Sequence, residues 1–66
     1  MFNLLDVVRL KNDDIEAGVK KTYKGAIVDV LDKGQAFTVE FFDEKGNTVE
    51  KALFKEYTTD QLELAQ

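Results

Sequence analysis

The chain of 66 residues contains no cysteine and no histidine. It therefore has no disulfide, no thiol nucleophile, no zinc site of the usual Cys/His type and no histidine acid or base. These absences remove most familiar enzyme mechanisms, so we expect a protein that is not an enzyme and has no metal or cofactor. The sequence also lacks a leader-like segment at Met1 and any apolar run near eighteen residues, which predicts a cytoplasmic protein with no membrane contact.

The charge is acidic overall, with a formal net charge of −4 and a pI of about 4.6. Such a field repels phosphate backbones and anionic membranes, which disfavours nucleic acid and favours a basic protein partner. A local exception surrounds Tyr23, where Lys20, Lys21 and Lys24 form a cluster of three positive charges. This cluster is either a solvated loop or an alternative nucleic-acid site with a base stacked on the Tyr23 ring.

The pattern of apolar residues predicts short strands. Phe37, Val39 and Phe41 alternate with a period of two, and glycine turns flank this segment at Gly34 and Gly46. Although 66 residues fill only one small core, 44% of them are hydrophobic, which is too many for a disordered chain. We expect strands over residues 6–10, 26–31, 37–42, 48–54 and 62–64.

Three of these assignments carry further expectations. Residues 26–31 contain only one polar side chain and should form a central strand that is covered on both sides. Residues 48–54 should form an edge strand, with Val49 and Leu53 inward around the charged Lys51. Residues 58–62 should form one 3₁₀ turn before the last strand.

The connections also have a predicted form. Residues 1–5 should lie against the barrel, and residues 11–19 should form an irregular loop held down by Ile15 and Val19. Together these features predict an all-β, five-stranded, SH3-like, partly open barrel with one short 3₁₀ turn near the C-terminus, in a single domain over residues 1–66. A small α+β domain is the alternative, but no ten-residue stretch has helical periodicity. The expected core consists of Val8, Val28, Val30, Phe37, Val39, Phe41 and Leu62.

Acidic residues are candidate site groups because paired carboxylates can share acid and base chemistry. Asp13, Asp14 and Glu16 lie in one loop, and Asp43 and Glu44 lie in a turn, so we expect all five to be solvated. Calcium binding by the oxygen ligands of Asn12, Asp13, Asp14 and Glu16 is not favoured, because their spacing does not match the alternating ligands and glycine of an EF-hand loop.

Aromatic residues give the stronger binding hypothesis. Phe42 breaks the inward and outward alternation of its strand, and Tyr23, Phe54 and Tyr57 fall at loop ends. Exposed rings of this kind are enriched at protein interfaces. We expect an aromatic patch centred on Phe42 and Tyr57 to bind a partner; the alternative is that these rings cover the ends of the barrel.

Three segments resemble a known family. They are Leu-Leu-Asp-Val-Val-Arg-Leu at residues 4–10, the Gly-Val-Lys-Lys run and its following strand at residues 18–31, and Ala-Phe-Thr-Val-Glu-Phe-Phe-Asp-Glu-Lys-Gly at residues 36–46. Together they resemble domain of unknown function 4926, a family of small bacterial SH3-like proteins. The resemblance carries no catalytic motif, and it implies the small partner of a gene pair, with an immunity or antitoxin role.

A remoter similarity involves the Lys-Gly turn at residues 24–25 before an apolar strand, which is similar to the KOW element of ribosomal and transcription proteins. KOW proteins are usually basic, and this acidic chain departs from that pattern. The sequence therefore predicts a noncatalytic module that docks to a larger protein. The alternatives are a weak KOW-like nucleic-acid-binding module and a small structural subunit of an enzyme assembly.

Overall fold

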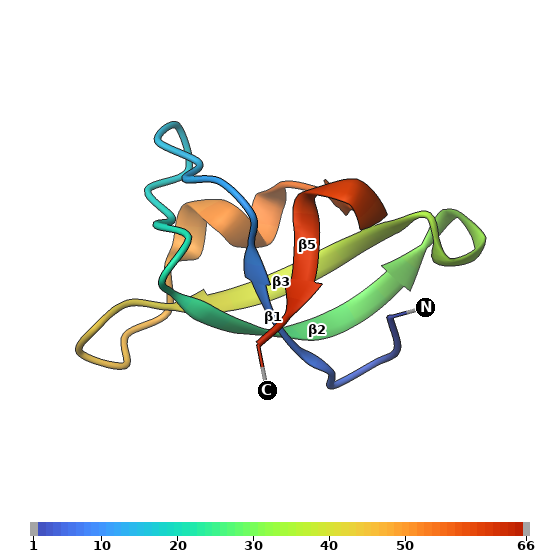
Figure 1. Cartoon of the computed structure of the whole chain (residues 1–66), viewed down its shortest axis with the longest axis horizontal. Coiled ribbons are helices and arrows are strands. Elements are labelled where there is room, and N and C mark those ends of the chain that lie inside the picture. The colour runs from blue at the N-terminus through green and yellow to red at the C-terminus, as the bar shows by residue number, and fades with distance from the viewer. Residues whose placement is uncertain (1, 66) are drawn as a thin grey trace.

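The computed structural model describes residues 2–65 and is all-β apart from three 3₁₀ turns (Figure 1). The five strands form one antiparallel sheet in the order β4-β3-β2-β1-β5, which does not close on itself. This is the expected five-stranded, partly open barrel. The strands are β1 (Val7–Leu10), β2 (Lys24–Leu31), β3 (Ala36–Phe42), β4 (Tyr57–Thr58) and β5 (Leu62–Leu64), and the 3₁₀ turns are η1 (Asp32–Gly34), η2 (Glu50–Phe54) and η3 (Thr59–Gln61).

The β2-β3 hairpin is the longest pairing in the sheet and crosses the whole width of the molecule in Figure 1. Its register pairs Gly25 with Phe41 and Ile27 with Val39, so the inward face of β3 meets small or branched residues of β2. Phe37, Val39 and Phe41 are fully buried, as the alternation in the sequence predicts.

A β-bulge in β2 overturns part of the predicted core. The register shifts between Ile27 and Asp29, which leaves Val28 as the extra residue, and Val28 is exposed. Val30 is also exposed, because it lies near the hairpin turn and β1 pairs with β2 only at Gly25 and Ala26. The expectation that β2 is covered on both sides, with Val28 and Val30 in the core, is therefore wrong.

The segment expected to be an edge strand at residues 48–54 is mostly the 3₁₀ turn η2. Only Thr48 makes a strand-like bridge, to Phe42. A 3₁₀ turn places residues i and i+3 on one face, and the Ala52 amide donates to the Val49 carbonyl across 3.2 Å. Val49 and Ala52 thereby face the core, whereas Leu53 is only half-buried and Lys51 is exposed on the turn.

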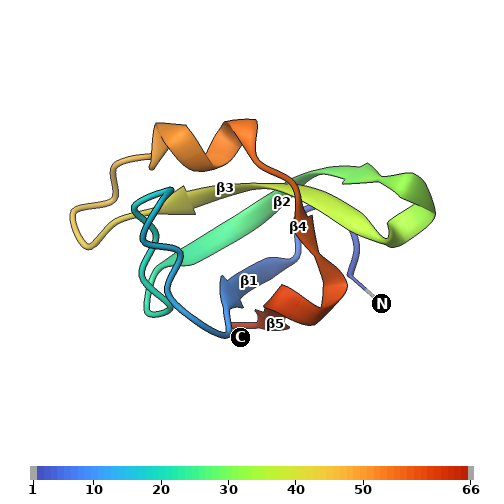
Figure 2. The same cartoon turned by 90° about the horizontal axis from the view of Figure 1, so that it is seen from above.

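The edge strand is instead β4, which pairs with the first residues of β3. A capping box in η3 links β4 to β5: the Thr58 amide donates to the Gln61 side-chain oxygen, and the Thr58 side-chain oxygen accepts the Gln61 amide. The predicted turn over residues 58–62 and the predicted last strand are thus confirmed. Figure 2 shows η2 running along β3, against which it packs.

The loop at residues 11–19 is irregular, as expected, and is closed by a two-bond bridge between Asp14 and Val19. Val19 is buried, but Ile15 is 89% exposed, so the prediction that Ile15 anchors the loop is wrong. Ala17 is buried in its place, because the Asp14 side chain accepts the Ala17 amide and turns that residue inward.

Two aromatic contacts add to the core. The ring of Phe41 meets Tyr57 edge-to-face at 5.5 Å between centroids, and Phe37 meets Phe2 in the same way at 5.7 Å. Phe2 thus packs against the barrel as expected, whereas Leu4 and Leu5 are exposed, and Met1 lies outside the described residues. No helix in residues 2–65 has the length and apolar character needed to cross a membrane.

Candidate functional site

Asp14 is the centre of the best-defined polar cluster in the structure. Its Oδ2 atom accepts hydrogen bonds from Lys55 Nζ at 2.6 Å and from the Tyr57 hydroxyl at 2.8 Å, while Oδ1 accepts the Ala17 amide at 3.3 Å. The Asp14 side chain retains only 16% of its exposure. The expectation that this carboxylate is solvated is therefore wrong: it joins the long loop to η2 and β4.

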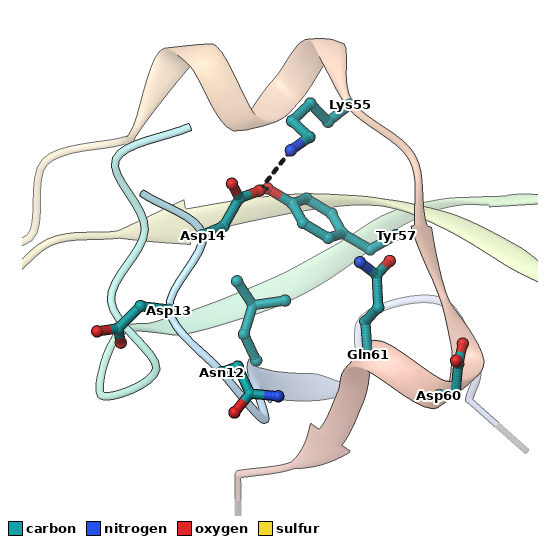
Figure 3. Close-up of a pocket in the computed structure, with 8 residues that line it drawn as sticks. Asn12, Asp13, Asp14, Lys55, Tyr57, Asp60 and Gln61 are labelled. Carbon is teal, nitrogen blue, oxygen red and sulfur yellow. Dashed lines mark hydrogen bonds and ion pairs between the residues drawn. The ribbon is translucent and has the colours of Figure 1, made fainter. Parts of the chain in front are cut away.

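Lys55 lies at the C-terminal end of η2 and reaches down to this carboxylate (Figure 3). Its Nζ atom is also 3.8 Å from Glu16 Oε1 and 5.6 Å from the centroid of the Tyr57 ring. The ammonium thus has one close carboxylate, one distant carboxylate and an aromatic face beside it.

The environment fixes the ionisation of this cluster at neutral pH. Burial raises the pKa of Asp14, but the hydrogen bonds from Lys55, Tyr57 and the Ala17 amide outweigh burial, and the pKa falls below its usual value. Burial and the bond to Asp14 raise the pKa of Tyr57 well above its usual value. Tyr57 therefore remains a protonated donor, and the arrangement suits holding a cation better than transferring a proton.

A cleft of about 350 Å³ opens beside this cluster, between the long loop and η3. In Figure 3 the Gln61 side chain extends toward the cleft from η3, and Asn12 and Asp13 border it from the loop. The residues that line the cleft are Leu10, Asn12, Asp13, Asp14, Lys55, Tyr57, Asp60 and Gln61.

A second hollow, of about 670 Å³, continues from the cleft at Asp60 toward η1. It is lined by Lys11, Asp32, Gln35, Ala36, Glu56, Thr58, Thr59 and Asp60. We call the two hollows together the acidic groove. The acidic residues that line it are Asp13, Asp14, Asp32, Glu56 and Asp60, and the lysines that line it are Lys11 and Lys55. Five acids against two lysines leave three negative charges uncompensated, out of a formal net charge of −4 for the whole chain.

The four aromatic residues singled out from the sequence do not form one patch. Tyr57 is fully buried against Phe41, so the expectation that its ring is exposed beside Phe42 is wrong. Phe42 and Tyr23 are half-buried and line a separate shallow hollow of about 310 Å³. Phe54 is 90% exposed at the end of η2 and directly precedes Lys55.

The lysine cluster lies near that separate hollow. Lys24 lines it and pairs with Phe42 in the sheet, while Lys20 forms an exposed ion pair with Glu44 at 3.8 Å. The Glu44 carboxylate also accepts the Tyr23 hydroxyl, and slight burial together with this bond raises the pKa of Tyr23. Lys21 is exposed, and its backbone amide donates to Asp13.

Asp43 serves the backbone of its own turn. Asp43 Oδ1 accepts the amides of Lys45 and Asn47, which closes the second glycine turn. Within residues 2–65 no three carboxylates converge in a way that would hold a metal ion.

Sequence reasoning missed Lys55, Asp60 and Gln61 as members of a site. Asp60 and Gln61 do carry a local signal, because Thr-Thr-Asp-Gln is a capping pattern that places polar side chains at the start of a turn. Lys55 carries none, since its partner Asp14 lies 41 positions earlier in the chain.

The comparisons with known proteins add one positive finding. The chain matches a family described as "Domain of unknown function (DUF4926)" over residues 4–63. Neither the curated proteins nor the solved structures contain a significant match. Because the match spans nearly the whole sequence and includes every strand except the last residue of β5, the chain belongs to the domain of unknown function family DUF4926.

Proposed function

We propose that this protein is a noncatalytic module that docks to a larger protein by receiving a basic segment of it in the acidic groove. The observation that carries the proposal is the charge of the residues that line the groove, which are five acids and only two lysines. Complementary charge speeds encounter with a basic partner and disfavours acidic competitors.

The exposed carboxylates of the groove are available to a partner. Asp13 and Asp60 are both exposed, and their described bonds, from the Lys21 amide and the Thr58 hydroxyl, leave further acceptor positions on each carboxylate. The hydrogen bond from Thr58 lowers the pKa of Asp60, so this group is ionised throughout the neutral range. The groove runs from the long loop past η3 to η1, so the partner segment that we propose is an extended one with Lys or Arg residues.

Two apolar side chains next to the groove supply a second kind of contact. Ile15 and Phe54 are 89% and 90% exposed, and they adjoin Asp14 and Lys55 in the chain. Because Lys55 contacts both Asp14 and Glu16, the segments that carry these two side chains meet at the groove. A large exposed ring beside a charged cleft is a common anchor in protein interfaces.

The proposal favours a role as the small partner in a pair of proteins, such as an immunity protein or antitoxin, on an SH3-like barrel. The long loop and the turns that line the groove are held by an all-β scaffold, and this supports such a use, since binding residues commonly lie on loops held by a rigid scaffold. In this proposal the hydroxyl of Tyr57 and the carboxylate of Asp14 fix the position of the long loop. The proposal does not require either group to act as an acid or a base.

The test is affinity capture from native cells with three forms of the protein, followed by quantitative mass spectrometry. The wild type is compared with Asp13→Asn/Asp60→Asn and with the control Asp29→Asn/Glu50→Gln, which removes two exposed charges outside the groove. A basic protein should be captured by the wild type and the control, and its affinity for the groove variant, measured on purified components, should fall by at least about fivefold at low salt.

Two other results would contradict the proposal. Capture of an acidic protein with equal efficiency by all three forms would place the interface elsewhere. Submicromolar binding of DNA or RNA at physiological salt, abolished by Lys20→Ala/Lys21→Ala/Lys24→Ala, would instead support the nucleic-acid alternative, for which Tyr23 and Lys24 beside a common hollow are the relevant observation.

A further inference from the structure

Lys55 places a cation of the chain itself inside the groove that we propose to receive a basic partner. Its ammonium lies 2.6 Å from Asp14 Oδ2, and Asp14 is the least exposed carboxylate among the ion pairs of the described residues. The Tyr57 ring provides an aromatic face 5.6 Å from the same ammonium. A carboxylate combined with an aromatic face is a recognition set for a lysine or arginine side chain.

Asp14 and Tyr57 are held in place by contacts other than those with Lys55. Asp14 is oriented by the Tyr57 hydroxyl on one oxygen and by the Ala17 amide on the other. Tyr57 in turn is fixed by its contact with Phe41 in the core and by its pairing with Phe37 in the sheet. Removal of the Lys55 ammonium would therefore leave an ionised carboxylate that still points into the cleft.

Part of the Lys55 side chain already lies in solvent. Its side chain is 37% exposed, and it lies between η2 and β4 on a flexible stem of four methylene groups. Its second carboxylate, Glu16, is 3.8 Å away and 91% exposed, so that contact is weak. The charges that face the ammonium are those of Asp14 and Glu16 from the loop, and Asp13 and Asp60 border the same cleft.

We propose that Lys55 is an intramolecular competitor: it occupies the position that a lysine or arginine side chain of the partner takes, and binding displaces it from Asp14. This inference rests on the proposed function of the groove. It assigns Asp14 and Tyr57 as the subsite for one cationic side chain, and it makes Lys55 a residue that lowers affinity.

The experiment measures binding of a capped octapeptide of alternating arginine and glycine by NMR titration and calorimetry. Lys55→Gln removes the competing charge, and Lys51→Gln is the matched control, since it removes an equal charge from the exposed side of the same turn. Lys55→Gln should bind the peptide about fivefold more tightly than the wild type, with Lys51→Gln within about twofold. The amide signals of Asp14 and Ala17 should move in each titration.

Lys55→Arg provides a second variant in which Asp14 remains paired. A guanidinium is a stronger competitor for a carboxylate, so this form should bind more weakly than the wild type. Thermal melts of each variant show whether it is folded, and Lys55→Arg decides the question if Lys55→Gln fails to fold. The proposal that Lys55 competes with the partner would be wrong if the wild type bound the peptide and affinity neither rose in Lys55→Gln nor fell in Lys55→Arg. The proposal that the groove binds basic segments would still stand. Absence of binding in every form would overturn the groove as well.

Discussion

The hydroxyl of Tyr57 donates a 2.8 Å hydrogen bond to Asp14, a residue 43 positions earlier in the chain. One side chain thereby belongs both to the core, through its contact with Phe41, and to the groove, through Asp14. The position of the long loop consequently depends on the packing of the barrel, and this connection can be tested by substitution.

Tyr57→Phe should destabilise the protein by about 1–2 kcal/mol, because the ring is kept while the part-buried Asp14 loses one donor. Urea denaturation would measure the loss. Tyr23→Phe is the matched control: its hydroxyl bond to Glu44 is exposed, so little change in stability is expected. Equal stability of Tyr57→Phe and the wild type would show that the hydrogen bond contributes nothing.

Stability should depend on pH at both ends of the scale. The pKa of Asp14 is lowered on folding, so its contribution is present above its unfolded value of about 3.8 and is lost as the pH falls through the folded value. The pKa of Tyr57 is raised, so its contribution is complete below about 10 and is lost as the pH rises above that value. Denaturation across the pH range should show the Asp14→Asn variant converging on the wild type in acid, and Tyr57→Phe converging on it in strong alkali. Parallel curves would contradict the assignment.

Gly25→Ala should destabilise the protein by about 1–3 kcal/mol through steric conflict. A Cβ atom at this position would lie 2.7 Å from side-chain atoms of both Phe41 and Val39 and 3.0 Å from the Glu40 carbonyl oxygen. Gly46→Ala is a useful contrast, since its Cβ atom meets nothing within 4 Å and the cost comes only from the backbone φ of +83°. Differential scanning calorimetry would compare the two, and the core packing of Gly25 would be in doubt if Gly25→Ala melted like the wild type.

Two phenylalanine residues should respond in opposite ways to truncation. Phe41 is fully buried, so Phe41→Ala should cost about 3–5 kcal/mol, which is most of the stability of a domain of this size. Phe54 is 90% exposed, so Phe54→Ala should change stability by less than about 0.5 kcal/mol. If Phe54 is an interface anchor, the same substitution should weaken partner binding by about tenfold or more. If Phe54→Ala binds the captured partner as tightly as the wild type does, Phe54 is not part of the docking surface.

The fold was predictable where side-chain periodicity is a local property. Residues 37–42 alternate cleanly, and their burial follows the alternation through Phe41. The predictions of burial fail where the periodicity of inward-facing side chains changes within one element. Nothing in Ile-Val-Asp-Val marks Val28 as the extra residue of a bulge, and Val49 with Ala52 fits a 3₁₀ turn, whereas Val49 with Leu53 fits a strand.

The site was less predictable than the fold, because its members are distant in sequence. Asp14 resembles any other loop carboxylate until Lys55 and Tyr57 are brought to it from 41 and 43 positions away. Tyr57 has an apolar ring and a polar tip, so its burial required knowing that Asp14 would satisfy the hydroxyl. Phe54 is exposed, but it carries the same loop-end signal as Tyr57, which is buried, so the sequence does not tell the two rings apart.

The capping box of η3 has a consequence for the behaviour of the protein at high concentration. Sheet edges with free amides recruit strands from other molecules and lead to aggregation. Here the edge strands of the sheet are β4 and β5, and one backbone amide of each strand is hydrogen-bonded to a residue of η3. The Thr58 amide donates to the Gln61 side chain, and the Leu62 amide donates to the Thr59 carbonyl. With only two and three residues in these edge strands, little backbone is left to template a neighbour. Gln61→Ala should therefore increase the tendency of the protein to form β-rich aggregates at the concentrations used for crystallisation.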